Sequence, residues 1–196
     1  YLPMFPTQAE AKARVLPDTL FVTGRGLEES IKEFYPNLLV QTAPAFRFQG
    51  VYRKAPKKNG VSSLVILIVL YSILEEAVTA LKFALETHLI LGNDISIKWK
   101  IKPHPMTHKN KLLDAIDRHV PESWEWMEND FHECLDEVNV LMGNASTTCM
   151  EALARGKFVL IIGNPNSLTH NPIPSGVPNE LWKLCYTPSE AAEVLK

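Results

Sequence analysis

The amino-acid sequence predicts an α/β protein in which helices cover both faces of a parallel sheet. Three observations support this fold class. From residue 64 to the C-terminus, segments of strand character alternate with segments of helical spacing, as they do in parallel sheets. The run Leu64–Leu70 is continuously apolar, which is typical of a strand buried on both faces. Gly156 stands between a helical segment and the next strand, where glycine commonly ends a helix.

The individual elements follow from local patterns along the chain. Residues 1–17 are irregular, apart from an Ala/Lys/Arg stretch compatible with a short helix. The helix expected at 27–35 ends before Pro36, because a residue that precedes proline avoids helical geometry. Strands are expected at residues 20–24, 38–42, 64–70, 95–101, 124–126, 140–143, 158–162 and 181–186. Helices are expected at residues 27–35, 75–86, 112–118, 131–138, 148–155 and 189–195.

Residues 44–63 differ from the rest of the chain in composition. They are rich in Gly, Pro and Lys and show no periodicity, as expected of an interdomain linker. The chain opens at Tyr1 without an initiator Met or a signal sequence, so we expect it to be a segment of a longer protein.

Charge, hydropathy and cysteine content argue against several classes of protein. The chain has 20 basic and 22 acidic residues, a balance that does not favour bulk binding of nucleic acid. Its longest apolar run, Leu64–Leu70, is far shorter than the ~20 residues of a membrane span. Cys134, Cys149 and Cys185 lie far apart, which favours reduced thiols over a disulfide framework or a zinc cluster.

Three loops that follow expected strands carry candidate chemistry. In the first, Lys102–Pro105, two prolines bracket His104 and stiffen its backbone. A histidine held in this way can donate an N–H to a phosphate, and Lys102 and Lys109 add positive charge nearby. The alternative is that Pro-His-Pro is only a stiff turn.

The second loop, Gly143–Thr148, places three hydroxyl residues at the expected start of a helix. Free backbone N–H groups and the helix dipole make such a start a natural anion site. The alternative is a capping box between Thr148 and Glu151, which closes a helix start without a ligand. Gly143 permits either the close approach of a ligand or a tight turn.

The third loop, Gly163–Asn179, is long and rich in Pro and Asn. Loops of this length within a compact domain are often functional, so His170 and the asparagines are candidates for sugar contacts, or else ordinary surface residues. All three loops follow strands of the same expected sheet. They therefore lie along its carboxyl edge, where ligands of parallel α/β sheets bind.

Residues from about 64 to the C-terminus resemble the C-terminal, Rossmann-like domain of GT-B glycosyltransferases. Lys102–Pro105 resembles the His-Pro motif of bacterial sialyltransferases, polysialyltransferases and CDP-glycerol-type polymerases. Val140–Leu160 resembles their hydroxyl-pair motif, with the pair at Ser146 and Thr147 followed by Glu-Ala-Leu and a glycine. The resemblance implies a nucleotide-sugar-binding domain at 64–196, a linker at 44–63 and the tail of an N-terminal domain at 1–43.

The resemblance also implies roles for individual residues. His104 would contact the phosphate or nucleotide of the donor, and Ser146 and Thr147 would hold the phosphate. Glu151 would face the ribose hydroxyls or cap the helix. The implied donor-binding set is Lys102, His104, Pro105, Gly143, Asn144, Ser146, Thr147, Thr148 and Glu151. Stabilisation of the departing nucleotide by a helix dipole and a histidine would require no metal, and the sequence contains no Asp-x-Asp metal motif.

The function implied is that of the donor-binding half of a glycosyltransferase of surface or capsular polysaccharide biosynthesis. A cytidine nucleotide sugar is favoured over a UDP sugar, and no further cofactor is expected. The general base and the groove for the carbohydrate acceptor would lie in the missing N-terminal domain. We therefore expect no catalytic residue within these 196 residues and no sugar transfer by this segment alone. A cytoplasmic location is expected, with peripheral attachment to the inner membrane through the full-length protein.

Two alternatives stay open at this stage. A UDP-sugar 2-epimerase shares the GT-B architecture and a similar hydroxyl–Glu motif, although it needs further acid/base carboxylates that the sequence does not identify. A non-catalytic nucleotide-binding module is the other. A dinucleotide-dependent dehydrogenase is disfavoured, because Leu70-Tyr-Ser-Ile-Leu-Glu stands where a Gly-x-Gly-x-x-Gly turn is required.

Overall fold

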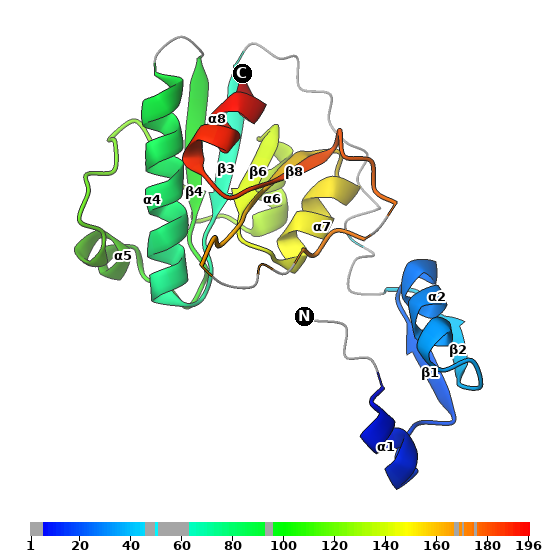
Figure 1. Ribbon diagram of the computed structural model, residues 1–196. Helices are drawn as coiled ribbons and strands as arrows, with labels where there is room; N and C mark the ends of the chain where they lie inside the picture. The colour runs from blue at the N-terminus through cyan, green and yellow to red at the C-terminus, as the bar shows by residue number, and fades with distance from the viewer. Residues whose placement is uncertain are drawn as a thin grey trace.

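The computed structural model describes residues 6–45, 50, 63–92, 96–166, 169, 171–174 and 176–196. These residues form two separate parallel sheets, one of two strands and one of six (Figure 1). Most of the linker predicted at 44–63, namely residues 46–49 and 51–62, lies outside the described part of the chain. The domain boundaries therefore stay a prediction.

The smaller sheet belongs to a βαβ unit near the N-terminus. Its elements are α1 (Gln8–Ala13), β1 (Thr19–Val22), α2 (Arg25–Phe34) and β2 (Leu39–Thr42), with β1 parallel to β2. Val22, Ile31 and Val40 form its small core. As predicted, α2 ends before Pro36.

The larger sheet confirms the predicted fold class. Its strands run in the spatial order β5-β4-β3-β6-β7-β8, and every neighbouring pair is parallel. They are β3 (Leu64–Val69), β4 (Ile97–Lys102), β5 (Glu125–Trp126), β6 (Val140–Gly143), β7 (Phe158–Ile162) and β8 (Trp182–Cys185). Counted from β3, this is the 3-2-1-4-5-6 order of the Rossmann fold.

Helices cover both faces of this sheet (Figure 1). They are α4 (Leu74–Leu91), α5 (Lys109–Ala115), α6 (Phe131–Asp136), α7 (Thr147–Ala154) and α8 (Pro188–Leu195). Alternate residues of β3 enter two different cores: Ile66 and Ile68 pack with α4 and α8, whereas Leu67 packs with α6 and α7. All three side chains are fully buried, as the continuous apolar run predicts.

Long-range polar contacts tie the sheet together. The backbone N–H of Val65 donates to the side-chain Oδ1 of Asn139 (2.8 Å), and the N–H of Asn139 donates to the carbonyl of Val65 (2.9 Å). At the C-terminal end of α7, the buried guanidinium of Arg155 pairs with Asp136, the last residue of α6. The paired hydrogen bonds of Val65 and Asn139 fix the register of β3 against β6, and the Arg155–Asp136 pair joins the end of α7 to α6.

Helix boundaries differ from the prediction at the C-terminal end of α4, which reaches Leu91 rather than residue 86, and at both ends of α5. Helix α5 spans Lys109–Ala115 rather than 112–118. Asp117 forms an ion pair with Lys82 of α4 (2.7 Å), and Arg118 forms one with Glu86 of α4 (2.7 Å). These two residues therefore belong to the loop after α5, which runs alongside α4. Of the helices in the described part of the chain, none has both the length and the apolar character that crossing a bilayer requires.

Candidate functional site

The strand order defines a switch point between β3 and β6. From β3 the chain crosses through α4 to β4 on one side, and it returns through α6 to β6 on the other side. The loops after β3 and β6 therefore leave the sheet in opposite directions. In parallel α/β sheets, the crevice between two such loops is the usual ligand site.

Gly143 closes the gap between these two strands. A Cβ atom at this position would lie 2.9 Å from the carbonyl oxygen of Val69 on β3, which is closer than side chains tolerate. Gly143 does not have a positive φ. The close contact with the end of β3 is therefore a structural reason for the glycine, whereas its predicted role toward a ligand stays a prediction.

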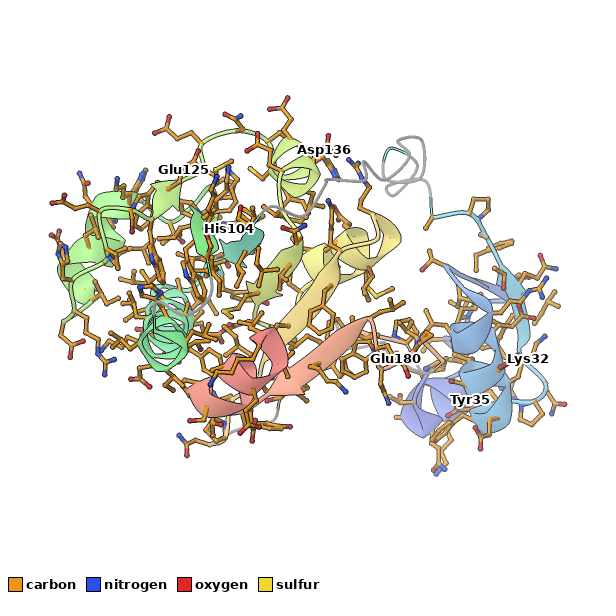
Figure 2. The ribbon with its side chains drawn as sticks, turned by 90° about the horizontal axis from the view of Figure 1, so that it is seen from above. Lys32, Tyr35, His104, Glu125, Asp136 and Glu180 are labelled. Atoms are coloured by element: carbon orange, nitrogen blue, oxygen red, sulfur yellow. The ribbon has the colours of Figure 1, made fainter. Side chains whose placement is uncertain are left out.

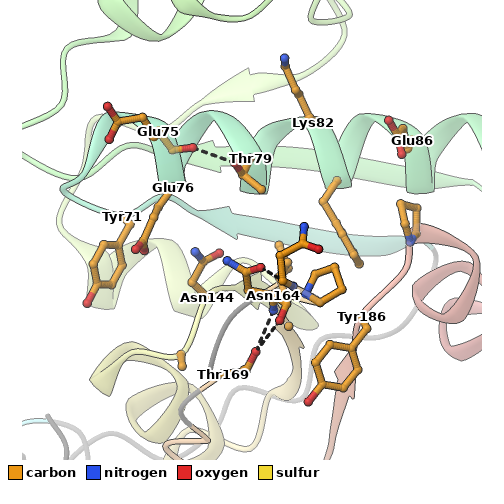
Figure 3. Close-up of a pocket in the computed structure, with 17 residues that line it drawn as sticks. Tyr71, Glu75, Glu76, Thr79, Lys82, Glu86, Asn144, Asn164, Thr169 and Tyr186 are labelled. Atoms are coloured by element: carbon orange, nitrogen blue, oxygen red, sulfur yellow. Dashed lines mark hydrogen bonds between the residues drawn. The ribbon is translucent and has the colours of Figure 1, made fainter.

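A cleft of about 620 Å³ opens at the carboxyl edge beside the switch point (Figure 3). Its walls come from the loop after β3, residues 75–86 of α4, the end of β7, the loops after β6, β7 and β8, and the first residue of α8. The lining residues are Tyr71, Glu75, Glu76, Thr79, Lys82, Phe83, Glu86, Asn144, Ala145, Ile162, Gly163, Asn164, Pro165, Asn166, Thr169, Tyr186 and Pro188.

The wall formed by α4 is acidic, and the opposite wall carries amides. Glu75, Glu76 and Glu86 line the cleft together with Lys82; Lys82 is paired with Asp117 and Glu86 with Arg118. Carboxylates and amide oxygens accept hydrogen bonds from hydroxyl groups. The α4 wall therefore suits the hydroxyls of a sugar or ribose better than it suits a phosphate.

The loop after β7 contributes the amides of Asn164 and Asn166. It is closed by its own hydrogen bonds, because Asn164 N–H donates to the hydroxyl of Thr169 (2.8 Å) and Asn166 N–H donates to Asn164 Oδ1 (2.9 Å). Two asparagines of this loop, which the sequence offers as candidates for sugar contacts, thus line the cleft. His170, also a candidate, lies outside the described residues.

Ser146 is the N-cap of helix α7, which corrects the capping box predicted between Thr148 and Glu151. Its hydroxyl accepts from the backbone N–H of Thr148 (3.3 Å) and from the Thr148 hydroxyl (3.1 Å). Thr148 is therefore the second residue of the helix and does not cap it. Thr147 is the first helical residue, so Ser146 and Thr147 stand at the positive end of the α7 dipole.

Asn144 and Cys149 connect the start of α7 to the cleft. Asn144 lines the cleft, and its Oδ1 is buried without a hydrogen-bond partner in the described part of the chain. The thiol of Cys149 donates to the carbonyl of Asn144 (3.6 Å). Burial raises the pKa of Cys149 to about 11, so it remains a thiol near neutral pH and serves as packing rather than as a nucleophile.

His104, labelled in Figure 2, lies on the loop after β4, which neighbours β3 on the side away from β6. The loop is a tight turn: Thr107 N–H donates to the carbonyl of His104 (2.8 Å), with Pro105 at the second position. Met106 N–H donates to Nδ1 of His104 (3.2 Å), which leaves Nε2 as the ring nitrogen able to donate to an anion. The hydroxyl of Thr107 is within 3.2 Å of the carbonyl of Tyr71, so this turn adjoins the β3 loop.

Of the nine implied donor-binding residues, all of which the structure describes, Asn144 is the one that lines the cleft. His104, Pro105 and Lys102 are not among the residues that line it. The amine of Lys102 lies 3.4 Å from the carbonyls of Met127 and Glu128. Both contacts go to the main chain beyond β5, which is a structural use of the charge.

Glu151 lies one turn into α7, and its side chain is 11% exposed. Its carboxylate is 3.7 Å from Nε2 of His132 at the start of α6. Glu151, like Ser146, Thr147 and Thr148, does not line the cleft. Its implied role toward a ribose stays a prediction.

Sequence reasoning missed several residues of the cleft, above all Tyr71, Glu76 and Tyr186. Each follows a strand or begins a helix at the carboxyl edge, so the rule that selected the other loops applies to them too. Tyr186 falls at the end of the strand expected at 181–186, whereas β8 ends at Cys185. Glu76 falls within an expected helix, and helical spacing alone does not show that it lines a cleft.

No protein-family model matches the chain, and the comparison with curated proteins finds no match. Among solved structures, the KpsC beta Kdo 2,4 transferase of Thermosulfurimonas dismutans is 17% identical over 61% of this chain and 43% of that chain, with a TM-score of 0.41.

The KpsC beta Kdo 2,7 transferase of the same organism is 19% identical over 73% of this chain, with a TM-score of 0.39. The similar region spans 46% of that protein, so this chain matches less than half the length of both structures. These likenesses concern the fold alone.

Proposed function

We propose that the chain is the donor-binding part of a glycosyltransferase of surface or capsular polysaccharide biosynthesis, and that it binds a nucleotide sugar at the switch point. The observation that carries the proposal is the cleft of about 620 Å³, which lies beside the β3–β6 crevice and adjoins the loop that begins α7. Ligand sites of small molecules have this size and this place in α/β sheets.

The residues around the cleft suit the two ends of such a ligand. The N-terminus of α7, with the hydroxyls of Ser146 and Thr147, offers a positive dipole and hydrogen-bond donors to a phosphate. Across the cleft, Glu75 and Glu76 offer acceptors to hydroxyl groups. Negative charge that develops on the departing nucleotide would be stabilised by the helix end.

The finer parts of the proposal come from the resemblance of Lys102–Pro105 and Val140–Leu160 to known motifs. They favour a cytidine nucleotide over UDP, and an enzyme of the sialyltransferase, polysialyltransferase or CDP-glycerol-polymerase kind. The proposal assigns the general base and the acceptor groove to an N-terminal domain, so the 196-residue chain binds the donor without transferring the sugar. It also places the protein in the cytoplasm.

Isothermal titration of the chain with CMP, CDP, UMP, UDP and GDP tests this proposal. We expect a cytidine nucleotide to bind most tightly. Ser146→Ala removes a hydroxyl at the start of α7 and should weaken binding, and His104→Ala should weaken it several-fold if Nε2 reaches the ligand. His119→Ala is the matched control, because His119 follows α5 and lines a different hollow beside β5.

Each outcome decides between the alternatives. Preference for UDP would redirect the proposal to a UDP-sugar transferase or to a 2-epimerase. If nucleotide binding is unchanged in both Ser146→Ala and His104→Ala, the ligand is elsewhere on the molecule. Absence of binding to all five nucleotides would contradict the proposal for this chain.

A further inference from the structure

Tyr186 holds a distinctive position at the rim of the cleft. It is the first residue after β8, it lines the cleft, and it is 43% exposed. Figure 3 shows its ring at one end of the cleft and Tyr71 at the other, with Asn144 and Asn164 between them. An exposed aromatic face next to polar side chains is a surface on which a flat ring can stack.

Gly163 holds the ring of Tyr186 in place. A Cβ atom on Gly163 would lie 2.5 Å from Cδ1 and 2.7 Å from Cε1 of the Tyr186 ring, which no side chain tolerates. The ring therefore packs directly against the backbone at the end of β7. Gly163 N–H also donates to the carbonyl of Cys185 (2.8 Å). This hydrogen bond holds the backbone of Gly163 next to the residue that precedes Tyr186.

The backbone of Tyr186 is fixed as well. Its N–H donates to Oε2 of Glu190 (2.7 Å). The same carboxylate accepts from Thr187 N–H (3.3 Å), and Glu190 N–H donates to the Thr187 hydroxyl (3.2 Å), which completes the capping box of α8. Because backbone and ring are both held before a ligand arrives, little conformational freedom is lost on binding.

The distance from Tyr186 to the start of α7 suits a nucleotide. Tyr186 follows β8 and Asn144 follows β6, two strands away in the sheet, and neighbouring strands lie about 4.8 Å apart. Tyr186 and Asn144 are therefore roughly 10 Å apart along the carboxyl edge. The amides of Asn164 and Asn166 lie on the loop between them. A nucleoside phosphate presents a charged end, a polyhydroxyl ring and a flat base in this order.

We infer that the ring of Tyr186, braced by Gly163, is the surface on which the base of the nucleotide stacks, with the phosphate directed toward the start of α7. This inference rests on the proposed function and adds to it the orientation of the ligand. Stacking tolerates every base, since each has a π-face. Tyr186 thus contributes affinity, and the choice between cytidine and uridine falls to other groups.

The test compares ligands with and without a base. Titration of Tyr186→Ala with CMP should show binding about tenfold weaker or more, as expected for the loss of one aromatic–base stack. Tyr186→Phe keeps the ring and should bind CMP within about twofold of the unaltered chain. Ribose 5-phosphate, which lacks the base, should bind equally to the unaltered chain and to Tyr186→Ala.

A second variant displaces the ring without removing it. Gly163→Ala should weaken CMP binding in the same direction as Tyr186→Ala, because the new methyl group pushes the ring aside. Gly26→Ala is the matched control, since a Cβ at Gly26 has no heavy atom within 4 Å. Thermal unfolding of each variant shows whether the fold is kept.

Three results would overturn the inference while leaving the proposed function intact. The first is unchanged CMP binding in Tyr186→Ala. The second is an equal loss for CMP and ribose 5-phosphate, which would make Tyr186 a structural residue only. The third is a loss in Tyr71→Ala with none in Tyr186→Ala, which would assign the base to the other end of the cleft. If the unaltered chain binds no nucleotide, both the inference and the proposed function fail.

Discussion

The carboxyl edge of the six-stranded sheet has two halves, one on each side of β3, and they use their polar residues differently. On the β6–β8 side, Asn144, Asn164 and Tyr186 line a cleft. On the β4–β5 side, His104 lies in a tight turn and Lys102 contacts main-chain carbonyls. The Lys102–Pro105 motif therefore lies on the β4–β5 side, whereas the cleft lies on the β6–β8 side.

The position of the helices explains this difference. α4 and α8 pack on the same face of the sheet. Their first residues line the cleft together with the loops after β6 and β7. On the β4–β5 side, α5 is short and ends at Ala115. A cleft forms where a loop at the carboxyl edge has an element packed on each side of it. Whether such elements are present depends on the strand order rather than on the sequence of the loop.

The largest expected effect concerns the strand junction between the two halves. Gly143→Ala places a methyl group 2.9 Å from the carbonyl oxygen of Val69, so β3 and β6 must move apart. We expect the free energy of unfolding to fall by about 1–3 kcal/mol, measured by urea denaturation, together with weaker nucleotide binding. Gly26→Ala, in open space on α2, should not lower stability. Equal behaviour of both variants would remove the close contact as the reason for Gly143.

Buried thiols on the β6–β8 side give a pH dependence. Burial raises the pKa of Cys149 and of Cys185 to about 11, whereas an unfolded thiol titrates near ~8.5. Between these values the folded state binds more protons than the unfolded state, so stability falls as pH rises. The slope should be at most about 1.4 kcal/mol per pH unit for each thiol. Urea denaturation from pH 8 to 11 measures it, and Cys149→Ala should flatten the fall.

The cap of α7 can be tested against the alternative that the sequence suggested. Ser146→Ala removes the hydroxyl that accepts from Thr148 N–H and should cost about 1 kcal/mol of stability. Thr148→Ala removes only a hydroxyl that donates to Ser146 and should cost less. If Thr148→Ala proves the more damaging of the two, Thr148 would be the cap after all.

The smallest effect is expected on the β4–β5 side. Lys102→Met loses two contacts of 3.4 Å to carbonyls, so stability should change by about 0.5 kcal/mol or less. Lys157→Met is the comparison, because Lys157 is buried and donates to the Val138 carbonyl at 2.8 Å. Its loss should cost more, about 1–3 kcal/mol. A large loss of nucleotide binding in Lys102→Met, at unchanged stability, would return Lys102 to the site.

Much of the fold could be predicted because its signals are local. The apolar run Leu64–Leu70 and the helix closed at Gly156 both depend on neighbours within a few residues, and the structure has β3 and α7 there. The predicted strands at 140–143 and 158–162 coincide with β6 and β7. Periodicity and glycine position carry such information without knowledge of the partner strand.

The composition of the site could not be predicted in the same way. Ser146, Thr147 and Thr148 all cap helices well, so their types alone do not identify the cap; the extended backbone of Ser146 does. Gly143 is explained by Val69, 74 residues earlier in the chain, and the position of Tyr186 by Gly163, the first residue after the adjacent strand β7. Such relations exist only once the strand order is known.

The pairing of Val65 with Asn139 has a consequence for how the chain folds. The two residues are 74 positions apart, yet together they align the first residues of the central strand. A nascent chain can pair β3 with β4 early, but one edge of β3 stays open until β6 has been synthesised. Contacts of such long separation form slowly, and an open apolar edge recruits other chains. Aggregation during expression should therefore be most severe for chains truncated before Val140.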